Sequence, residues 1–378
     1  MRIMMMVPRL PLDLDQIKGG AVSAARNLLR GFSELNVQMR VVSYDNALDR
    51  KYIKQPYPNI EIHYEPEGRF PFHSMNYWVH GPAILQRQID DFKPDVIHYQ
   101  SGNTFMFTHR GVKTTAKYAL TIHGMALEEA RRKKKLKDKM AWYFNAWTQE
   151  RTLPNNVIHL SKFSLNKFGH LIANNTIIPN AIVPGFFNIP MKTGATENKL
   201  LYMGVIDNNK NLFYQLQQLN ILAKKNIHFT LDVLGDYMQD DIRQQITEYI
   251  QANDLTPYIR FHGWVPQTGV MKFIEEADIL VVSSKHESLP MVIAESMAAG
   301  KTVIASAVGG IPEMIDHGVD GYLFHLSGPD ELSGILADLY NNTEKIRMIS
   351  ARAKQTALEK YDCVNVARKT LAFYQTCK

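Results

Sequence analysis

The sequence predicts an α/β protein made of two similar domains, each built on a parallel β-sheet. Short apolar runs alternate with longer amphipathic segments along all 378 residues, and this alternation is typical of βαβ units. A stretch rich in proline and glycine, 179–196, separates two halves of similar length and pattern. We therefore expect Rossmann-like domains at 1–178 and 197–363, joined by this linker, and a last helix at 364–378 that packs back on the first domain.

The apolar runs give the expected strands. In the first half these are Arg2–Val7, Met39–Tyr44, Ile60–Tyr64, Val96–Tyr99, Tyr118–Thr121 and Val157–Leu160. In the second half they are Leu200–Met203, Phe229–Leu234, Ile259–His262, Ile279–Ser283, Val303–Ser306 and Gly321–Phe324. The amphipathic segments Ala21–Glu34 and Asp240–Asn253 are expected helices. Ligands of open parallel sheets bind beyond the carboxyl ends of the strands, so we expect a ligand in a cleft that the two domains share.

Composition excludes several classes of protein. A net charge of +6 is too weak to indicate a nucleic-acid partner, and two cysteines cannot build a disulfide framework or a cysteine-based metal site. The first apolar run ends at Pro8, which is short for a signal peptide, and no stretch approaches the roughly 18 apolar residues of a spanning helix. The sequence thus predicts a cytoplasmic protein.

One charge run stands out. The nine residues Arg131–Lys139 include seven basic ones, and Trp142, Tyr143, Phe144 and Trp147 follow them. Cations beside interfacial aromatic side chains suit an anionic membrane surface, so peripheral attachment to the inner face of the membrane is one expectation. The alternative is a solvated helix whose aromatic side chains pack inward.

The segment 283–300 carries the strongest functional pattern. Ser288 is expected to cap a helix, Pro290 suits its first turn and Gly300 suits its end. This helix would open at the carboxyl end of a strand and offer unpaired N–H groups to an anion.

Two glutamates, Glu287 and Glu295, can both address a ligand at this helix start. Phosphate would repel a carboxylate, whereas the hydroxyls of a sugar or ribose would donate hydrogen bonds to it. Ordinary surface charge is the alternative explanation.

Glu287-x7-Glu295, with Ser288-Leu289-Pro290 inside it, resembles the signature of the family-4 retaining glycosyltransferases of the GT-B fold. The resemblance covers nearly all of the second half, through Ile178–Ala181, Met203-Gly204, Gly235, Gly263-Trp264-Val265, Gly309–Ile315 and Gly318–Leu323. It is looser in the first half, at Gly19-Gly20, Asp95–His98 and Thr121–Gly124.

The resemblance implies three catalytic positions. Glu287 contacts hydroxyls of the donor sugar, Lys210 neutralises the diphosphate, and His123 lies near the reacting carbon and hydrogen-bonds the sugar. Without the resemblance, Lys210 would pass as a surface lysine in a polar turn, and His123 as a structural histidine.

The resemblance also implies the donor-binding positions. Glu295 binds the ribose diol, and Gly19 and Gly20 let the first loop approach the leaving phosphate, although a simple turn would explain two glycines equally well. Gly263 and Val265 lie where the nucleobase packs. The remaining donor-binding positions are Ser288, Leu289, Pro290, Met291 and Gly235.

The sequence departs from the family pattern at two positions. Val205 replaces an arginine and Asn211 replaces a glycine. Loss of one cation matters because negative charge develops on the leaving diphosphate. Arg9, Lys18 and Lys285 are candidates to replace it, and a catalytically silent relative is the alternative.

The implied reaction moves a hexose-type sugar, with retention, from a nucleoside diphosphate to an acceptor hydroxyl. UDP is favoured over GDP, no metal or other cofactor is expected, and the acceptor is expected to be a cell-envelope glycan such as lipopolysaccharide, capsule or another surface polysaccharide. We interpret Asp13-Leu14-Asp15, which mimics a metal-binding pattern, as coincidence. Competing functions are an oxidoreductase, disfavoured because no G-x-G-x-x-G follows the first strand, an exported sugar receptor, and a non-catalytic scaffold of the same fold.

Overall fold

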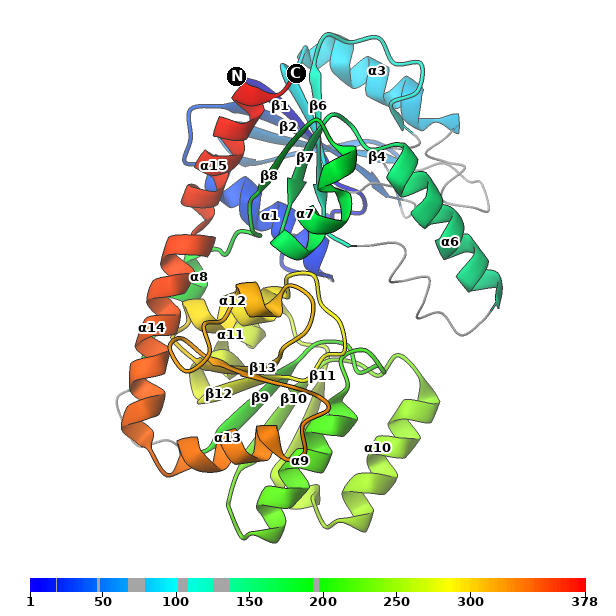
Figure 1. Cartoon of the computed structure of the whole chain (residues 1–378). Helices are drawn as coiled ribbons and strands as arrows, with labels where there is room; N and C mark the ends of the chain where they lie inside the picture. The colour runs from blue at the N-terminus through cyan, green and yellow to red at the C-terminus, as the bar shows by residue number, and fades with distance from the viewer. Residues whose placement is uncertain (18, 46–47, 67–78, 101–107, 125–135, 193–196) are drawn as a thin grey trace. The chain divides into compact units, whose positions relative to one another are not determined.

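The computed structural model describes residues 1–17, 19–45, 48–66, 79–100, 108–124, 136–192 and 197–378 (Figure 1). They form two compact units, the first comprising Met1–Ala181 with Cys363–Lys378 and the second Ile182–Asp362. Lys18 and the residues from Arg131 to Lys135, which include most of the predicted membrane-binding charge run, lie outside the described residues.

The first unit is an eight-stranded sheet in the order β3-β4-β2-β1-β5-β6-β7-β8. Its strands are β1 (Arg2–Met6), β2 (Gln38–Asp45), β3 (Tyr52–Tyr57), β4 (Ile60–Pro66), β5 (Val96–Tyr99), β6 (Lys117–Ile122), β7 (Asn156–His159) and β8 (Asn174–Ile177). Its longer helices are α1 (Gly20–Phe32), α3 (Gly81–Phe92), α6 (Leu136–Arg151), α7 (Lys162–Phe168) and α15 (Cys363–Thr376). Every described strand pair in this sheet is parallel except β3 with β4.

Both faces of the first sheet are covered, which explains the unbroken apolar run in β1. Ile3 and Met5 belong to the core on one face, and Met4 and Met6 to the core on the other. Each fully buried side chain of this kind contributes roughly 1.5–3 kcal/mol. The first core includes residues of α1 and α15, and the second includes residues of α3.

The C-terminal helix α15 packs closely on α1. A Cβ atom at Gly31 would lie 2.0 Å from the carbonyl oxygen of Cys363, so only glycine allows this approach. Further along α15, the ring of Tyr374 stacks on Phe32 with centroids 6.2 Å apart. The last helix is therefore part of the core of the first unit.

The second unit is a six-stranded, fully parallel sheet in the order β11-β10-β9-β12-β13-β14. Its strands are β9 (Lys199–Met203), β10 (Thr230–Leu234), β11 (Ile259–Gly263), β12 (Ile279–Val282), β13 (Thr302–Ser306) and β14 (Tyr322–Phe324). Its α-helices are α8 (Pro184–Phe187), α9 (Leu212–Lys224), α10 (Asp240–Ala252), α11 (Gln267–Glu276), α12 (Met291–Ala298), α13 (Glu331–Tyr340) and α14 (Thr343–Tyr361).

Each strand expected from the sequence is present within two residues of its predicted ends. Two strands were missed, β3 and β8, and both lie at an edge of the first sheet. Their side chains are half-buried or exposed, so no apolar run marks them.

Candidate nucleotide-sugar site

The strand order of the second sheet reverses between β9 and β12. Chain progression runs one way from β9 to β10 and β11, and the other way from β12 to β13 and β14. The loops that leave the carboxyl ends of two such strands diverge and leave space for a ligand. Lys210 follows β9 and Glu287 follows β12, so both predicted residues lie at this switch point.

Glycines occupy the carboxyl ends of the three strands on one side of the switch point. Gly204, Gly235 and Gly263 follow or end β9, β10 and β11, with φ values of 143°, 141° and 66°. The amide of Gly235 donates to the carbonyl of Gly263 at 2.7 Å. A Cβ atom at Gly235 would lie 1.9 Å from the carbonyl oxygen of Gly204, so backbone packs against backbone along this edge.

Lys210 and Glu287 are in direct contact. The ammonium nitrogen lies 2.5 Å from Glu287 Oε1, and their side chains are 25% and 11% exposed. The hydroxyl of Ser284 donates to the same carboxylate oxygen at 2.7 Å. A largely buried carboxylate is thereby held beside the Lys210 ammonium group, part of which is still accessible to solvent.

The two loops that carry this pair are joined by hydrogen bonds to backbone carbonyl groups. The amide of Lys285 donates to the carbonyl of Asn209 at 2.7 Å, and the side chain of Asn209 donates to the carbonyl of His286 at 3.1 Å. The Ser283 hydroxyl donates to the carbonyl of Asn211 at 3.0 Å. The loop that carries Lys210 and the loop that carries Glu287 therefore hold each other in place.

Asn211 adopts the left-handed conformation, with φ 57°. Asparagine tolerates this region better than most residues, so its substitution for the family glycine preserves the backbone. Val205, which stands in place of the family arginine, is 42% exposed and cannot supply the positive charge that the arginine would carry. Of the three candidate cations, Lys285 is exposed on the loop joined to Asn209, and Arg9 is exposed in the first unit.

The predicted helix cap at Ser288 is wrong. Helix α12 begins at Met291, its N-cap is Pro290, and no side chain caps it. Pro290 lacks an N–H group, so it has no backbone donor to offer a ligand, and Ser288 and Leu289 lie half-buried before the helix. Gly300 follows the C-cap with φ 66°, as its predicted role as the helix stop requires.

Glu295 lies inside α12 and is 8% exposed. It is therefore far less accessible than a surface carboxylate. Met291, at the start of the helix, is equally buried and belongs to the packed side of α12.

Gly309, which follows β13, packs directly against the backbone of Glu287. A Cβ atom at this position would lie 1.8 Å from the carbonyl oxygen of Glu287, and the amide of Gly310 donates to that oxygen at 3.0 Å. The resemblance included both glycines, but only the structure connects them to Glu287.

A cavity of about 510 Å³ opens beside two of the predicted donor-binding glycines. Gly235 and Gly263 line it, together with Asp236, Tyr237 and Phe261 among others. Asp236 accepts a hydrogen bond from the amide of Trp264 at 3.1 Å and so holds the turn that leads to half-buried Val265.

The remaining predicted residues belong to the first unit. Gly19 is the N-cap of α1 with φ 103°, a conformation that favours glycine, and a Cβ there would meet nothing within 4 Å. Gly20 opens α1, and both glycines are exposed. His123 follows β6, and its Nε2 atom lies 2.7 Å from the side-chain oxygen of Gln100. Burial lowers the pKa of the His123 imidazole to about 4.

Residues 188–356 match the family model described as Glycosyl transferases group 1, and residues 18–185 match the one described as Glycosyltransferase Family 4. The chain belongs to the GT-B glycosyltransferases. The two matched ranges cover most of both units, so the family assignment extends to the half that the sequence motifs matched only loosely.

Proteins of similar sequence are also glycosyltransferases. An uncharacterized glycosyltransferase of Methanocaldococcus jannaschii, MJ1178, is 25% identical over 89% of each chain. The lipopolysaccharide 1,2-N-acetylglucosaminetransferase of Salmonella typhimurium is 33% identical over 45% of this chain and 46% of its own.

Solved structures show the same fold. Sucrose-phosphate synthase from Thermosynechococcus elongatus superposes with a TM-score of 0.81 at 16% identity, over 99% of this chain and 98% of its own. Anabaena HepE in complex with UDP and glucose gives a TM-score of 0.73 at 15% identity, over 99% of each chain.

Proposed function

We propose that this glycosyltransferase moves a hexose-type sugar from a nucleoside diphosphate, UDP rather than GDP, to an acceptor hydroxyl. The contact of Lys210 with Glu287 at the switch point of the second sheet carries the proposal. The Lys210 ammonium group can pair with a phosphate, and the Glu287 carboxylate can accept hydrogen bonds from hydroxyl groups. A sugar linked to a nucleoside diphosphate presents both kinds of group side by side. The choice of UDP is supported by HepE, whose structures contain UDP, UDP-glucose, or UDP and glucose.

In the proposed reaction, the bond between the anomeric carbon and the diphosphate oxygen breaks while the acceptor oxygen bonds to that carbon. Negative charge grows on the diphosphate and is stabilised by Lys210 and by backbone N–H groups of the Ser288–Met291 segment. Glu287 accepts hydrogen bonds from sugar hydroxyls, and Glu295 is proposed to bind the ribose.

We further propose that the departing phosphate oxygen takes the acceptor's proton, which gives retention without a protein nucleophile. Lys210 and the backbone dipoles take the place of a metal ion in this scheme.

The proposed acceptor is a cell-envelope glycan. Relatives include enzymes of this kind, such as the lipopolysaccharide transferase of Salmonella and a protein of amylovoran biosynthesis in Erwinia amylovora. A non-catalytic member of the fold is the alternative, and Val205 in place of arginine is the observation that favours it.

Release of nucleoside diphosphate distinguishes these two functions. Incubated with a panel of UDP- and GDP-sugars and lipid-linked or soluble glycan acceptors in the presence of a chelator, the enzyme is expected to release UDP and to form an α-linked product from an α-linked donor. Binding of UDP without release of UDP from any donor would favour the non-catalytic alternative. Turnover that requires a divalent metal would contradict the metal-free scheme.

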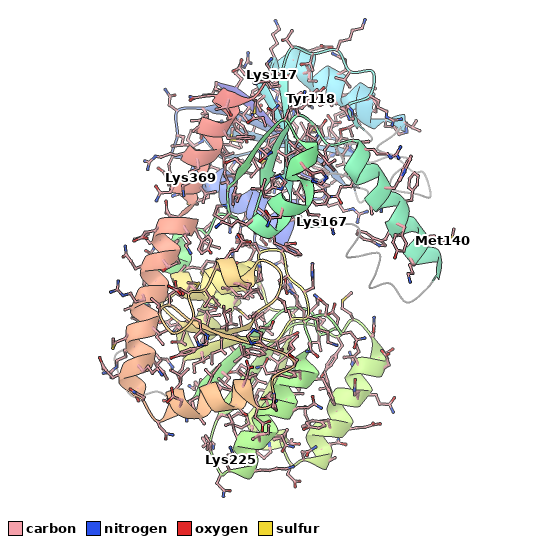
Figure 2. All side chains as sticks on the ribbon, viewed as in Figure 1. Lys117, Tyr118, Met140, Lys167, Lys225 and Lys369 are labelled. Carbon is pink, nitrogen blue, oxygen red and sulfur yellow. The ribbon has the colours of Figure 1, made fainter. Side chains whose placement is uncertain are left out.

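Helix α6 supports a membrane-facing role for the first unit. Met140, Tyr143, Phe144 and Trp147 are each more than 40% exposed, and their spacing places them on one face of the helix. Ala146, which lies outside this face, is buried. Figure 2 labels Met140 near the start of α6, the end that follows the basic run in the sequence. Among the described residues, no helix is both long and apolar enough to cross a bilayer.

We propose that this stripe inserts into an anionic membrane surface and that the run Arg131–Lys139 adds electrostatic attraction. The double variant Phe144→Ser/Trp147→Ser is expected to lose at least about tenfold in binding to phosphatidylglycerol-containing vesicles, because two interfacial side chains no longer insert. Met348→Ser, which alters an exposed apolar side chain on α14 of the second unit, is the control and should bind as the wild type does. Equal vesicle binding by all three proteins would contradict membrane insertion of α6.

A further inference from the structure

We propose that Gln100 is a positioning residue that fixes the tautomer of His123, so that His123 accepts a hydrogen bond from a sugar hydroxyl through Nδ1. The hydroxyl's identity rests on the proposed function, whereas the tautomer follows from the first unit alone. Gln100 follows β5 and His123 follows β6, and these strands are parallel neighbours. Both side chains therefore emerge at the same carboxyl edge of the sheet.

His98, the buried histidine of β5, is held in a fixed orientation by two hydrogen bonds. The hydroxyl of Tyr374, on the C-terminal helix α15, lies 2.6 Å from Nδ1 of His98, and Oγ1 of Thr121 lies 2.8 Å from Nε2. Burial lowers the pKa of His98 to about 3, so its ring is neutral, with one nitrogen donating and the other accepting. Two hydroxyls, each able to donate or accept, satisfy both nitrogens and fix the plane of the ring.

The His98 ring orients the amide of Gln100. The amide nitrogen lies 3.3 Å from both ring nitrogens. An atom equally close to both must lie over the face of the ring, because an in-plane position would collide with the carbon atom that joins them. The face of an aromatic ring carries partial negative charge and favours an N–H group over a carbonyl oxygen. The NH₂ group of Gln100 therefore rests on His98, and its oxygen points the other way.

That oxygen determines the proton position on His123. It lies 2.7 Å from Nε2 of His123, and a carbonyl oxygen can only accept, so Nε2 carries the proton. Since burial lowers the pKa of His123 to about 4, the ring holds no second proton near neutral pH. Nδ1 consequently presents a lone pair, and a sugar hydroxyl must donate to it.

The described groups near His123 are neutral and leave its protonation state unchanged near neutral pH. Among the described residues that line the small cavity around His123, His98 is the one other titratable group, and it is neutral. Tyr374 faces His98 from α15, and burial raises its pKa well above the usual value, so it too is neutral. A change of ionisation in this cluster near neutral pH is therefore not expected in the wild type.

The test reads the tautomer directly, by ¹⁵N NMR of histidine-labelled full-length protein without substrate. His123 resonances are assigned by their loss in His123→Asn. We expect the wild type to show a protonated Nε2 and a non-protonated Nδ1. Gln100→Leu removes the acceptor, so we expect a mixture of tautomers and a fall of about tenfold in kcat, with little change in the donor KM.

Gln100→Glu is the matched variant, because it keeps an acceptor oxygen at the same length. It should keep the Nε2–H tautomer and most of the activity at pH 8. Its carboxylate should raise the pKa of His123, so kcat should fall as the pH is lowered toward 6, where protonated Nδ1 can no longer accept.

A wild-type ring protonated on Nδ1, or the same single tautomer in Gln100→Leu, would overturn the assignment. If the tautomer is as expected and responds to both Gln100 variants, but no donor sugar is turned over, the positioning of His123 by Gln100 stands and the proposed function alone fails.

Discussion

Lys210→Met is expected to lower kcat by at least about a hundredfold, with the fold intact. The methionine keeps the length and apolar stem of the lysine but removes the charge that we propose stabilises the growing negative charge of the diphosphate. Loss of one such charge-stabilising contact typically costs two to three orders of magnitude. The effect should be large here because Val205 replaces the second cation of the family pattern.

Glu287→Gln should have a similar effect, because the amide keeps an acceptor for Ser284 but loses the charge that pairs with Lys210. The two changes act on one contact, so the double variant should be much less impaired than the product of the single effects. Lys225→Met, which alters an exposed lysine after α9 in the same unit, is the control and should retain full activity. Folded Lys210→Met and Glu287→Gln enzymes with near wild-type kcat would show that the site is wrongly assigned.

Gly309→Ala is expected to lower activity by about a hundredfold without removing any functional side chain. The new Cβ would lie 1.8 Å from the carbonyl oxygen of Glu287, so the loop must move and its hydrogen bond from Gly310 must weaken. Displacement of a catalytic group by about 1 Å can cost this much rate.

Gly318→Ala separates this displacement from backbone strain. Gly318 also has positive φ, 78° against 56° at Gly309, but a Cβ there meets nothing within 4 Å. Both variants should lose about 1–2 kcal/mol in the free energy of unfolding from the left-handed backbone, and only Gly309→Ala should lose kcat. Equal kcat values for the two variants would contradict the proposal that Gly309 supports Glu287.

The architecture could be predicted because both sheets are largely parallel and their central strands are buried on both faces. Strand β13 is buried along its whole length and β1 at every residue after Arg2, so both appear in the sequence as apolar runs. The edge strands β3 and β8 were missed because an edge strand without a buried face carries no such run.

Two of the predicted site residues, Lys210 and Glu287, lie in contact, but this local geometry could not be predicted from the sequence. The spacing of Glu287 and Lys210 gave no sign that they touch, because 77 residues separate them in the chain. Ser288 has the residue type of a helix cap, yet the helix begins at Met291, after a proline that takes the N-cap position.

The proposed positioning of His123 by Gln100 could not be predicted from the sequence either. Its role depends on the ring face of His98, which is held by Tyr374 from a helix 276 residues away. A polar residue directly after a buried strand was the one local signal, and it does not specify a partner.

The central claim is that the carboxyl edge of the second sheet binds a nucleoside diphosphate through Lys210. Calorimetric titration of UDP into the full chain tests it most directly, since it requires neither the sugar nor the acceptor to be known. We predict one UDP bound per chain, with a dissociation constant raised at least about tenfold by Lys210→Met and unchanged by Lys225→Met. Absence of binding of both UDP and GDP to the folded wild type, or equal affinity in the Lys210→Met variant, would contradict the claim.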